Sequence, residues 1–142
     1  MKLQFSAGGV VFRNKEVLLC QHSQHHGWVF PKGLIGDRKE NESKEQTALR
    51  EVTEETGAIG KIVKSLTPVT YWFVSEGEKV KKTVYYFLME DVGGDITKHD
   101  HEMENVEWLP VEKVEERLTY NSDKKVWEVA LRAINRRLKA QK

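Results

Sequence analysis

One segment, residues 36–58, constrains this chain more than any other because it carries strong helix signals at both ends. Ser43 can cap a helix, and Gln46, three residues later, completes a capping box. Gly57 is the residue type that adopts the left-handed conformation beyond a last helical turn. We therefore expect one helix between Ser43 and Gly57. Its apolar side would consist of Ala48, Leu49 and Val52.

The polar side of this helix concentrates negative charge. Glu51, Glu54 and Glu55 stand at i, i+3 and i+4 and so share one face, where like charges repel. Arg50, four residues before Glu54, can pair with it but cannot balance all of these charges. A hard divalent cation can, because Mg²⁺ takes oxygen ligands and is typically bound by carboxylates together with substrate phosphates. The spacing therefore favours a metal site.

The alternative interpretation is a solvated surface helix whose charges pair with one another. It would leave the other fixed spacings of the segment unexplained. The full pattern is Gly-x5-Glu-x7-Arg-Glu-U-x-Glu-Glu-x-Gly-U, where U is aliphatic, and it resembles the signature of the Nudix hydrolases. The matching residues are Gly36, Glu42, Arg50, Glu51, Val52, Glu54, Glu55 and Gly57. Only the last position differs from the family pattern, because Ala58 stands where a larger aliphatic residue is expected.

The resemblance implies a fold and a reaction. Nudix hydrolases cleave nucleoside diphosphates linked to another moiety, and their signature forms a loop-helix-loop beside a mixed sheet that lies between helices. We therefore expect an α+β chain, an α/β/α sandwich, with residues 1–142 as one domain and residues 36–58 as its Nudix box. The expected cofactor is Mg²⁺, with Mn²⁺ able to replace it. The metal ligands that the resemblance implies are Glu51, Glu54, Glu55, the carbonyl oxygen of Gly36, and Glu42 directly or through water.

Apolar and β-branched runs predict the rest of the fold. The expected strands are residues 4–12, 16–21, 67–75, 80–89 and 105–109, and the expected further helices are residues 111–118 and a long final helix capped by Ser122. Strands followed by a helix, more strands and terminal helices are typical of an α+β sandwich.

The general base is expected either on the helix or on a later loop. By the resemblance, some members of the family use a signature glutamate and others a glutamate that precedes a late strand. Glu102, in the loop before residues 105–109, is our preferred base, and Glu54 is the candidate on the helix. A carboxylate can take a proton from water if it reaches that water and its pKa is suitable. Arg50 would orient the glutamates rather than contact substrate.

Substrate recognition must lie outside the signature. The run Trp28-Val29-Phe30-Pro31-Lys32-Gly33 resembles that of the diadenosine tetraphosphate hydrolases and the diphosphoinositol polyphosphate phosphohydrolases. A histidine before this run and a Lys-Thr-Val strand followed by aromatic residues favour the dinucleotide branch, since aromatic faces can stack on bases. The expected substrate-binding residues are His26, Lys32, Tyr71, Lys82, Tyr86 and Tyr120. The alternative for the aromatic residues is packing in the sheet core.

The charge balance bears on possible binding partners, and the cysteine content bears on the cellular compartment. Lys and Arg total 23 against 22 Asp and Glu, which argues against a long nucleic-acid groove, although an RNA 5′ end stays among the candidate substrates. The single cysteine, Cys20, fits a reducing cytosol. Because the start of the chain also lacks a secretory apolar segment, we expect a cytoplasmic protein without membrane contact. It is expected to act on a nucleotide small molecule as a monomer or homodimer.

These observations leave three interpretations. The first, which we favour, is a Mg²⁺-dependent pyrophosphohydrolase that cleaves bis(5′-nucleosyl) polyphosphates, such as diadenosine tetraphosphate, asymmetrically to ATP and AMP. The second is the same chemistry on an oxidised nucleoside triphosphate, ADP-ribose, an RNA 5′ end or an inositol pyrophosphate. The third is a module that binds nucleotides without cleaving them. Such a module would be expected to lack signature carboxylates, and all of them are present here.

Overall fold

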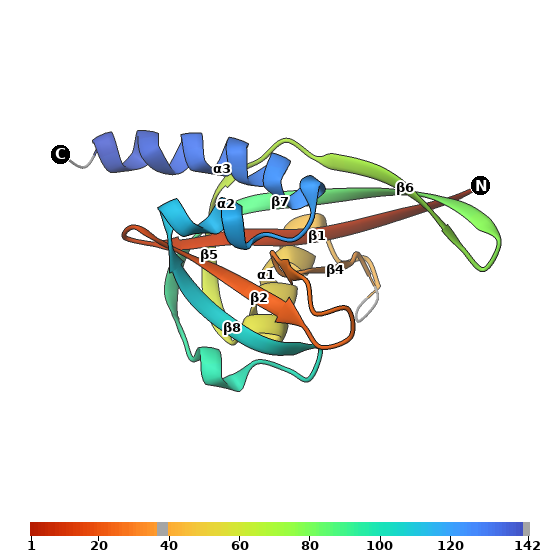
Figure 1. Ribbon diagram of the computed structural model, residues 1–142, viewed down its shortest axis with the longest axis horizontal. Helices are drawn as coiled ribbons and strands as arrows, with labels where there is room; N and C mark the ends of the chain where they lie inside the picture. The colour runs from red at the N-terminus through yellow and green to blue at the C-terminus, as the bar shows by residue number, and fades with distance from the viewer. Residues whose placement is uncertain (37–39, 141–142) are drawn as a thin grey trace.

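The computed structural model describes residues 1–36 and 40–140 (Figure 1). The expected motif at residues 36–58 includes residues 37–39, which lie outside the described residues. The strands are β1 (Lys2–Arg13), β2 (Glu16–His22), β3 (Trp28–Val29), β4 (Lys32–Leu34), β5 (Ala58–Ser65), β6 (Val69–Ser75), β7 (Glu78–Gly94) and β8 (Met103–Pro110). The helices are α1 (Lys44–Thr56), α2 (Val114–Arg117) and α3 (Asn121–Ala140), with the 3₁₀ turns η1 (Ile96–Lys98) and η2 (Val111–Lys113).

The strands form one mixed sheet with the central order β3-β2-β1-β7-β5. Strand β1 runs parallel to β7, from Lys2 opposite Val80 to Phe12 opposite Glu90. The other pairings are antiparallel: β4 lies beside β1, β6 beside β7, and β8 beside β2. The predicted mixed sheet is confirmed.

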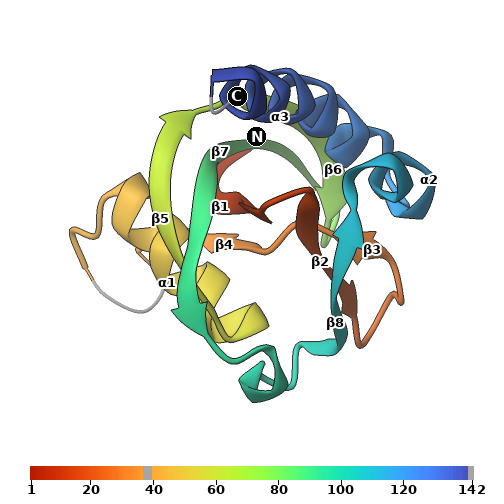
Figure 2. The same ribbon diagram turned by 90° about the vertical axis from the view of Figure 1, so that its left-hand side faces the viewer.

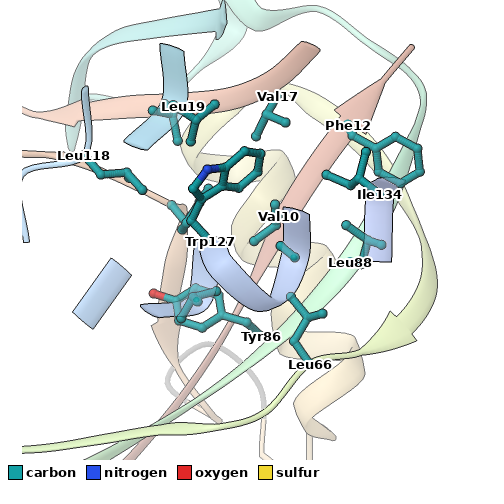
Figure 3. Packing of buried hydrophobic residues seen from close by; sticks show 14 of the residues in the cluster. Val10, Phe12, Val17, Leu19, Leu66, Tyr86, Leu88, Leu118, Trp127 and Ile134 are labelled. Atoms are coloured by element: carbon teal, nitrogen blue, oxygen red, sulfur yellow. The ribbon is translucent and has the colours of Figure 1, made fainter. Parts of the chain in front are cut away.

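Helices α1 and α3 lie on opposite sides of β1 and β7 (Figure 2). Under α3 is a hydrophobic core that includes Val10, Leu88 and Trp127, and Figure 3 shows Trp127 lying close to Val10 there. Under α1 is a second core that includes Val11 and Val52. The predicted sandwich is therefore present, with one core in each layer. None of the described helices is long and apolar enough to span a membrane.

Alternation along the central strands supplies both cores. Successive side chains of a strand point to opposite faces of its sheet. On β1, Val10 therefore joins the core under α3 and Val11 the core under α1, and Leu88 and Met89 divide in the same way on β7. Because both faces are buried, a slip of one residue would exchange every side chain between the cores, so the burial pattern specifies the register.

Helix α1 begins and ends where the sequence predicts. The Ser43 side chain accepts a hydrogen bond from the backbone N–H of Gln46 at 3.1 Å, and the Gln46 side chain accepts one from the backbone N–H of Ser43 at 2.9 Å. Gly57 has a φ of 82°, and a Cβ at this position would lie 2.0 Å from the carbonyl oxygen of Asp95. Glycine is therefore required both for the conformation and for the close approach of another segment.

Other elements differ from the expectation. The N–H of Lys124 donates to the carbonyl of Tyr120, so α3 begins at Asn121 and Ser122 lies inside its first turn instead of capping it. Strand β5 was not predicted, because its lysines and Gly60 interrupt the apolar pattern; its pairing with the long β7 forms it. The helix expected at residues 111–118 is the turn η2 followed by the four-residue α2.

Candidate active site

A polar pocket of about 200 Å³ lies where helix α1 faces strand β4 and the loop that precedes β8. Its lining residues are Lys32, Gly33, Leu34, Glu51, Glu54, Glu55, Lys82, Asp100 and Glu102. The fold thus places the preferred base candidate, Glu102, beside the helix carboxylates, although about fifty residues of sequence separate them. Gly36 and Glu42 do not line this pocket.

Arg50 connects the glutamates into one network. Its Nε donates to Oε2 of Glu42 and its Nη2 to Oε1 of Glu42, each at 2.8 Å. Its Nη1 donates to Glu51 at 2.8 Å and to Glu54 at 3.0 Å, so the expected pairing with Glu54 is present. The hydroxyl of Thr47 donates a further hydrogen bond to Glu42 at 2.8 Å. Glu42 is buried and does not line the pocket. It holds the arginine that contacts the other glutamates.

Glu55 and Glu102 both line the pocket, and their negative charges act on each other. Burial, then the neighbouring charges of Glu51 and Glu102, raise the pKa of Glu55 to about 10. The Glu102 side chain thus lies close enough to Glu55 to act on it electrostatically. The backbone N–H of Lys32 donates to Glu55 at 3.2 Å. The pocket thus gathers more carboxylates than its own cations neutralise.

The loop that carries Glu102 is tied to the helix and to a second loop. The backbone N–H of Asp100 donates to the carbonyl of Glu54 at 3.0 Å, and the Asp100 carboxylate accepts from the N–H of Glu102, also at 3.0 Å. On the other side, the N–H of Ser23 donates to the carbonyl of Glu102 at 2.8 Å. Asp100 is thus a site residue that sequence reasoning missed, since a single aspartate in a polar loop carries no spacing signal.

Gly33 permits the close contact between β4 and α1. A Cβ at this position would lie 2.2 Å from the carboxyl carbon of Glu51. Any side chain there would displace the Glu51 carboxylate from the pocket. The glycine that ends the Pro-Lys-Gly run is therefore required by the position of the Glu51 carboxylate.

The donor set of the pocket fits a hard divalent cation. Its available ligands are carboxylate oxygens, which suit Mg²⁺ or Mn²⁺, and a cation would neutralise the charge that raises the pKa of Glu55. Across residues 1–36 and 40–140, however, no three His, Cys, Asp or Glu side chains already converge as a formed metal site. Arg50 holds one oxygen each of Glu51 and Glu54. The ligand set therefore stays a prediction.

A second pocket, of about 450 Å³, adjoins the first and shares Lys32 with it. Its other lining residues are His25, Val29, Val69, Tyr71, Val84, Tyr86, Tyr120, Asn121, Ser122 and Asp123. The walls are mostly apolar and aromatic, and a few polar groups converge on the interior, as in many small-molecule sites. The tyrosines expected from the sequence to bind substrate all line it, although Tyr86 is almost completely buried and also packs in the core.

The structure places His25, rather than the expected His26, in the second pocket. The Nδ1 atom of His25 lies 3.0 Å from the hydroxyl of Tyr120 and accepts a hydrogen bond from the N–H of Gly27. His26 has a φ of 62° and points away, where its Nδ1 contacts the Glu104 carboxylate at 2.5 Å. From sequence, adjacent histidines in a turn cannot be told apart, because the turn geometry decides which one faces inward.

Two lysines bring positive charge to the carboxylate pocket. Lys32 and Lys82 both line it, and Lys81, next to Lys82 on β7, projects instead to the other face and lies over the Trp72 ring. Burial, and then the charge of Lys32, lower the pKa of Lys82 to about 8. The two ammonium groups are thus near enough to repel each other, and an anion between them would relieve that repulsion.

Comparison with known proteins finds relatives that cover most of this chain. A model of the NUDIX domain matches residues 2–129. A Mycobacterium tuberculosis protein named as mutator protein MutT4 is 42% identical to this chain over 103 residues. These are 72% of this chain and 40% of that protein. The 8-oxo-(d)GTP phosphatase of Mycolicibacterium smegmatis is 32% identical over 111 residues, 78% of this chain and 32% of that protein. The chain thus spans about a third to two fifths of the length of these relatives.

Solved structures show the same fold. A NUDIX hydrolase from Nitrosomonas europaea superposes with a TM-score of 0.75 at 16% identity, over 93% of this chain and 90% of that one. An Ap4A hydrolase of C. elegans, solved as a binary complex, gives a TM-score of 0.64 at 21% identity, over 93% of this chain and 98% of that one. At these identities the likeness concerns the fold alone.

Proposed function

The chain belongs to the NUDIX domain family, and from that membership we propose that it is a divalent-metal-dependent hydrolase that cleaves a phosphoanhydride bond of a nucleoside polyphosphate. One observation carries this proposal. The pocket lined by carboxylates and the pocket lined by aromatic side chains adjoin, with Lys32 between them. A nucleotide needs such a pair of surroundings, since its base is flat and apolar and its phosphate chain is anionic.

Each part of the substrate has a counterpart. The base would occupy the pocket between Tyr71 and Tyr120, where aromatic stacking on a base contributes about 1–3 kcal/mol. Lys32 and Lys82 would contact the phosphate chain. The scissile phosphorus would then lie beside the helix carboxylates, because these line the same pocket as both lysines.

The carboxylates have separate roles in the reaction. Glu51, Glu54 and Glu55 would hold the cation, which when bound neutralises phosphate oxygens and lowers the pKa of a coordinated water. Glu102 would take a proton as the water oxygen attacks phosphorus, while the bridging oxygen leaves with the departing phosphate. Glu54 is the alternative base. Arg50 keeps Glu51 and Glu54 in position through its Nη1.

For the substrate we favour an oxidised nucleoside triphosphate over the dinucleoside polyphosphate expected from the sequence. The support comes from the relatives, which are named as a mutator protein and an 8-oxo-(d)GTP phosphatase.

Diadenosine tetraphosphate is the second candidate. Two lysines in the carboxylate pocket could serve a longer phosphate chain than that of a triphosphate. In this case one adenosine would be fixed in the aromatic pocket, so that water attacks at a set distance along the chain and the products are ATP and AMP. Release of two ADP would contradict this asymmetric cleavage.

The test is a substrate panel with Mg²⁺ and product identification by ion-exchange chromatography. The panel contains 8-oxo-dGTP, dGTP, diadenosine tetraphosphate, ADP-ribose and a 5′-triphosphorylated RNA, and Glu54→Gln is the control for contaminating hydrolases. We expect 8-oxo-dGTP to give the highest kcat/KM. Faster release of ATP and AMP from diadenosine tetraphosphate would select the second candidate, and no hydrolysis of any nucleotide would overturn the proposal.

A further inference from the structure

Strand β6 (Val69–Ser75) lies at an edge of the sheet. Within the described part of the chain it pairs with β7 alone, so one of its two sides faces outward. Figure 1 shows the hairpin of β6 and β7 extending beyond helices α1 and α3. An edge strand presents unpaired N–H and C=O groups to which another strand can bind.

The turn of the hairpin decides which backbone groups of β6 face outward. Glu76 and Gly77 form a two-residue turn with φ values of 51° and 77°, as in a type I′ turn. Ser75 and Glu78 flank this turn and form a hydrogen-bonded pair, and such pairs alternate with non-bonded ones along the hairpin. Every second residue of β6 therefore points its N–H and C=O groups away from β7. These residues are Thr70, Trp72 and Val74.

This edge lacks the features that usually prevent strands from pairing. The sequence of β6, VTYWFVS, contains no charged residue and no proline, although 32% of the chain is charged. Its pairing with β7 has no register shift, so no bulge twists the edge away. Trp72 is 52% exposed and Val74 69%. A regular, exposed and apolar edge of this length is expected to pair with another strand.

The nearest lysines leave the edge accessible. Lys79 and Lys81 belong to β7, one strand inward, and their ammonium groups lie over the Trp72 ring at 5.6 and 5.7 Å from its centre. If a second copy of β6 were added at the edge, the two β7 strands would be three strand spacings apart, about 14 Å. Lysines at that separation repel each other weakly, because it exceeds the Debye length of about 8 Å.

We propose that this chain forms a two-fold symmetric homodimer in which β6 pairs antiparallel with β6 of a second copy, so that two sheets become one. The strand is suited to itself because it carries no charge that a second copy would repel. Complete overlap of the two strands places Trp72 opposite the partner's Trp72, and Tyr71 opposite the partner's Phe73. In the same register the outward groups of Thr70 meet those of the partner's Val74. Aromatic cross-strand pairs of this kind contribute roughly 0.2–1 kcal/mol each.

The first test measures the mass in solution by analytical ultracentrifugation, between about 1 μM and 1 mM protein. One pair of short strands buries less area than the roughly 1,200–2,000 Å² of a standard interface, so we expect a dissociation constant on the order of 10 μM. The mass should rise with concentration from 16.5 kDa to twice this value. A mass of 16.5 kDa at every concentration would overturn the inference.

Amide hydrogen exchange, followed by NMR, identifies the surface that pairs. The outward N–H groups of Thr70, Trp72 and Val74 should exchange about tenfold more slowly at the highest concentration than at the lowest, since pairing gives them acceptors. Those of Tyr71 and Phe73 face β7 and should be protected at both concentrations. A dimer in which the three outward groups still exchange rapidly would use another surface and would also overturn the inference. This experiment uses the unmodified protein, so it does not depend on whether a variant folds.

Trp72→Lys supplies a matched perturbation. Two like charges would then lie opposite each other at the two-fold axis, which should raise the dissociation constant at least about tenfold. Val92→Lys adds the same charge at a similarly exposed apolar position, 56% exposed, toward the other end of β7, and should dimerise normally. The NMR spectrum outside β6 reports whether each variant is folded. Equal dimerisation of the two folded variants would contradict pairing through β6. Because each copy keeps its own two pockets, neither result bears on the proposed function.

Discussion

Arg50 and Glu42 form a two-point contact, with Nε–Oε2 and Nη2–Oε1 distances of 2.8 Å each. The side chain of Glu42 is only 4% exposed and that of Arg50 20%. Parallel hydrogen bonds between a guanidinium and a carboxylate fix orientation as well as distance. Because Nη1 of the same arginine holds Glu51 and Glu54, the contact with Glu42 sets the geometry of the carboxylates that face the substrate.

Replacing Arg50 by lysine should damage both stability and activity. Lysine keeps the charge but cannot hold Glu42 and the helix glutamates at the same time. Breaking a buried ion pair typically costs about 3–5 kcal/mol; because lysine retains the charge, we expect about 2–4 kcal/mol in the free energy of unfolding, measured by urea denaturation. Arg13→Lys is the matched control. Arg13 pairs with Glu16 on the surface, where such a pair contributes roughly 1 kcal/mol or less. Equal losses in the two variants would contradict the proposed role of Arg50.

Glu54→Gln should reduce kcat by about a hundredfold or more while the Tm stays near that of the unmodified protein. The substitution keeps size and helix propensity and removes one charge from the proposed metal ligands. Glu45→Gln, in the exposed first turn of the same helix, should retain full activity. Normal turnover in Glu54→Gln would sink the assignment of this helix face to the metal. Glu42→Gln should act mainly through stability, since Glu42 does not line the pocket.

Glu102→Gln tests the general base. We expect kcat to fall by about 10²–10⁴, the usual contribution of a positioned acid or base, with Mg²⁺ affinity nearly unchanged. Glu104→Gln is the neighbouring control, because Glu104 contacts His26 outside the pocket. If Glu102→Gln turned over substrate normally while Glu54→Gln were inactive, the base would belong on the helix.

Tyr120→Ala should raise KM more than it lowers kcat. Tyr120 lines the base pocket and is about 40% exposed, and its hydroxyl contacts His25. Because the base does not react, a stacking contact with it would be equally strong in the bound substrate and in the transition state. Trp72→Ala removes a similarly exposed ring on β6 that does not line either pocket and should leave both constants unchanged. A fall in kcat at constant KM would place Tyr120 in the chemistry instead of in binding.

The stability of the protein should fall with rising pH in a way that depends on Asp123. Burial raises the pKa of Asp123 from its ordinary 3.8 to about 6, so the folded protein holds this proton more tightly than the unfolded chain. The resulting stabilisation is fully present below about pH 4 and is lost as the pH rises through 6. Asp123→Asn removes the titration. The difference in unfolding free energy, variant minus unmodified protein, should therefore increase by up to about 3 kcal/mol from pH 4 to pH 8. Urea denaturation at both pH values checks this, and the same pH dependence in both proteins would refute it.

Several features of the protein follow from short stretches of sequence. Ser43, Gln46 and Gly57 predicted both ends of α1, because capping depends on side-chain and backbone groups within one or two turns. The spacing of Glu51, Glu54 and Glu55 likewise predicted that they share a face, since helical periodicity is local. Alternation along β7 also explains locally why Lys82 lines the carboxylate pocket and its neighbour Lys81 does not.

Only the tertiary structure decided the remaining relationships, because they join residues that are far apart in the chain. Glu102 meets Glu55 since β8 pairs with β2 and the preceding loop is pinned to the end of α1. Asp123 enters the base pocket because the first turn of α3 approaches Tyr86 on β7, 37 residues away. No local period relates such pairs. Their distances depend on sheet register and on how the helices pack over the two cores, and these are set by the burial of the whole chain at once.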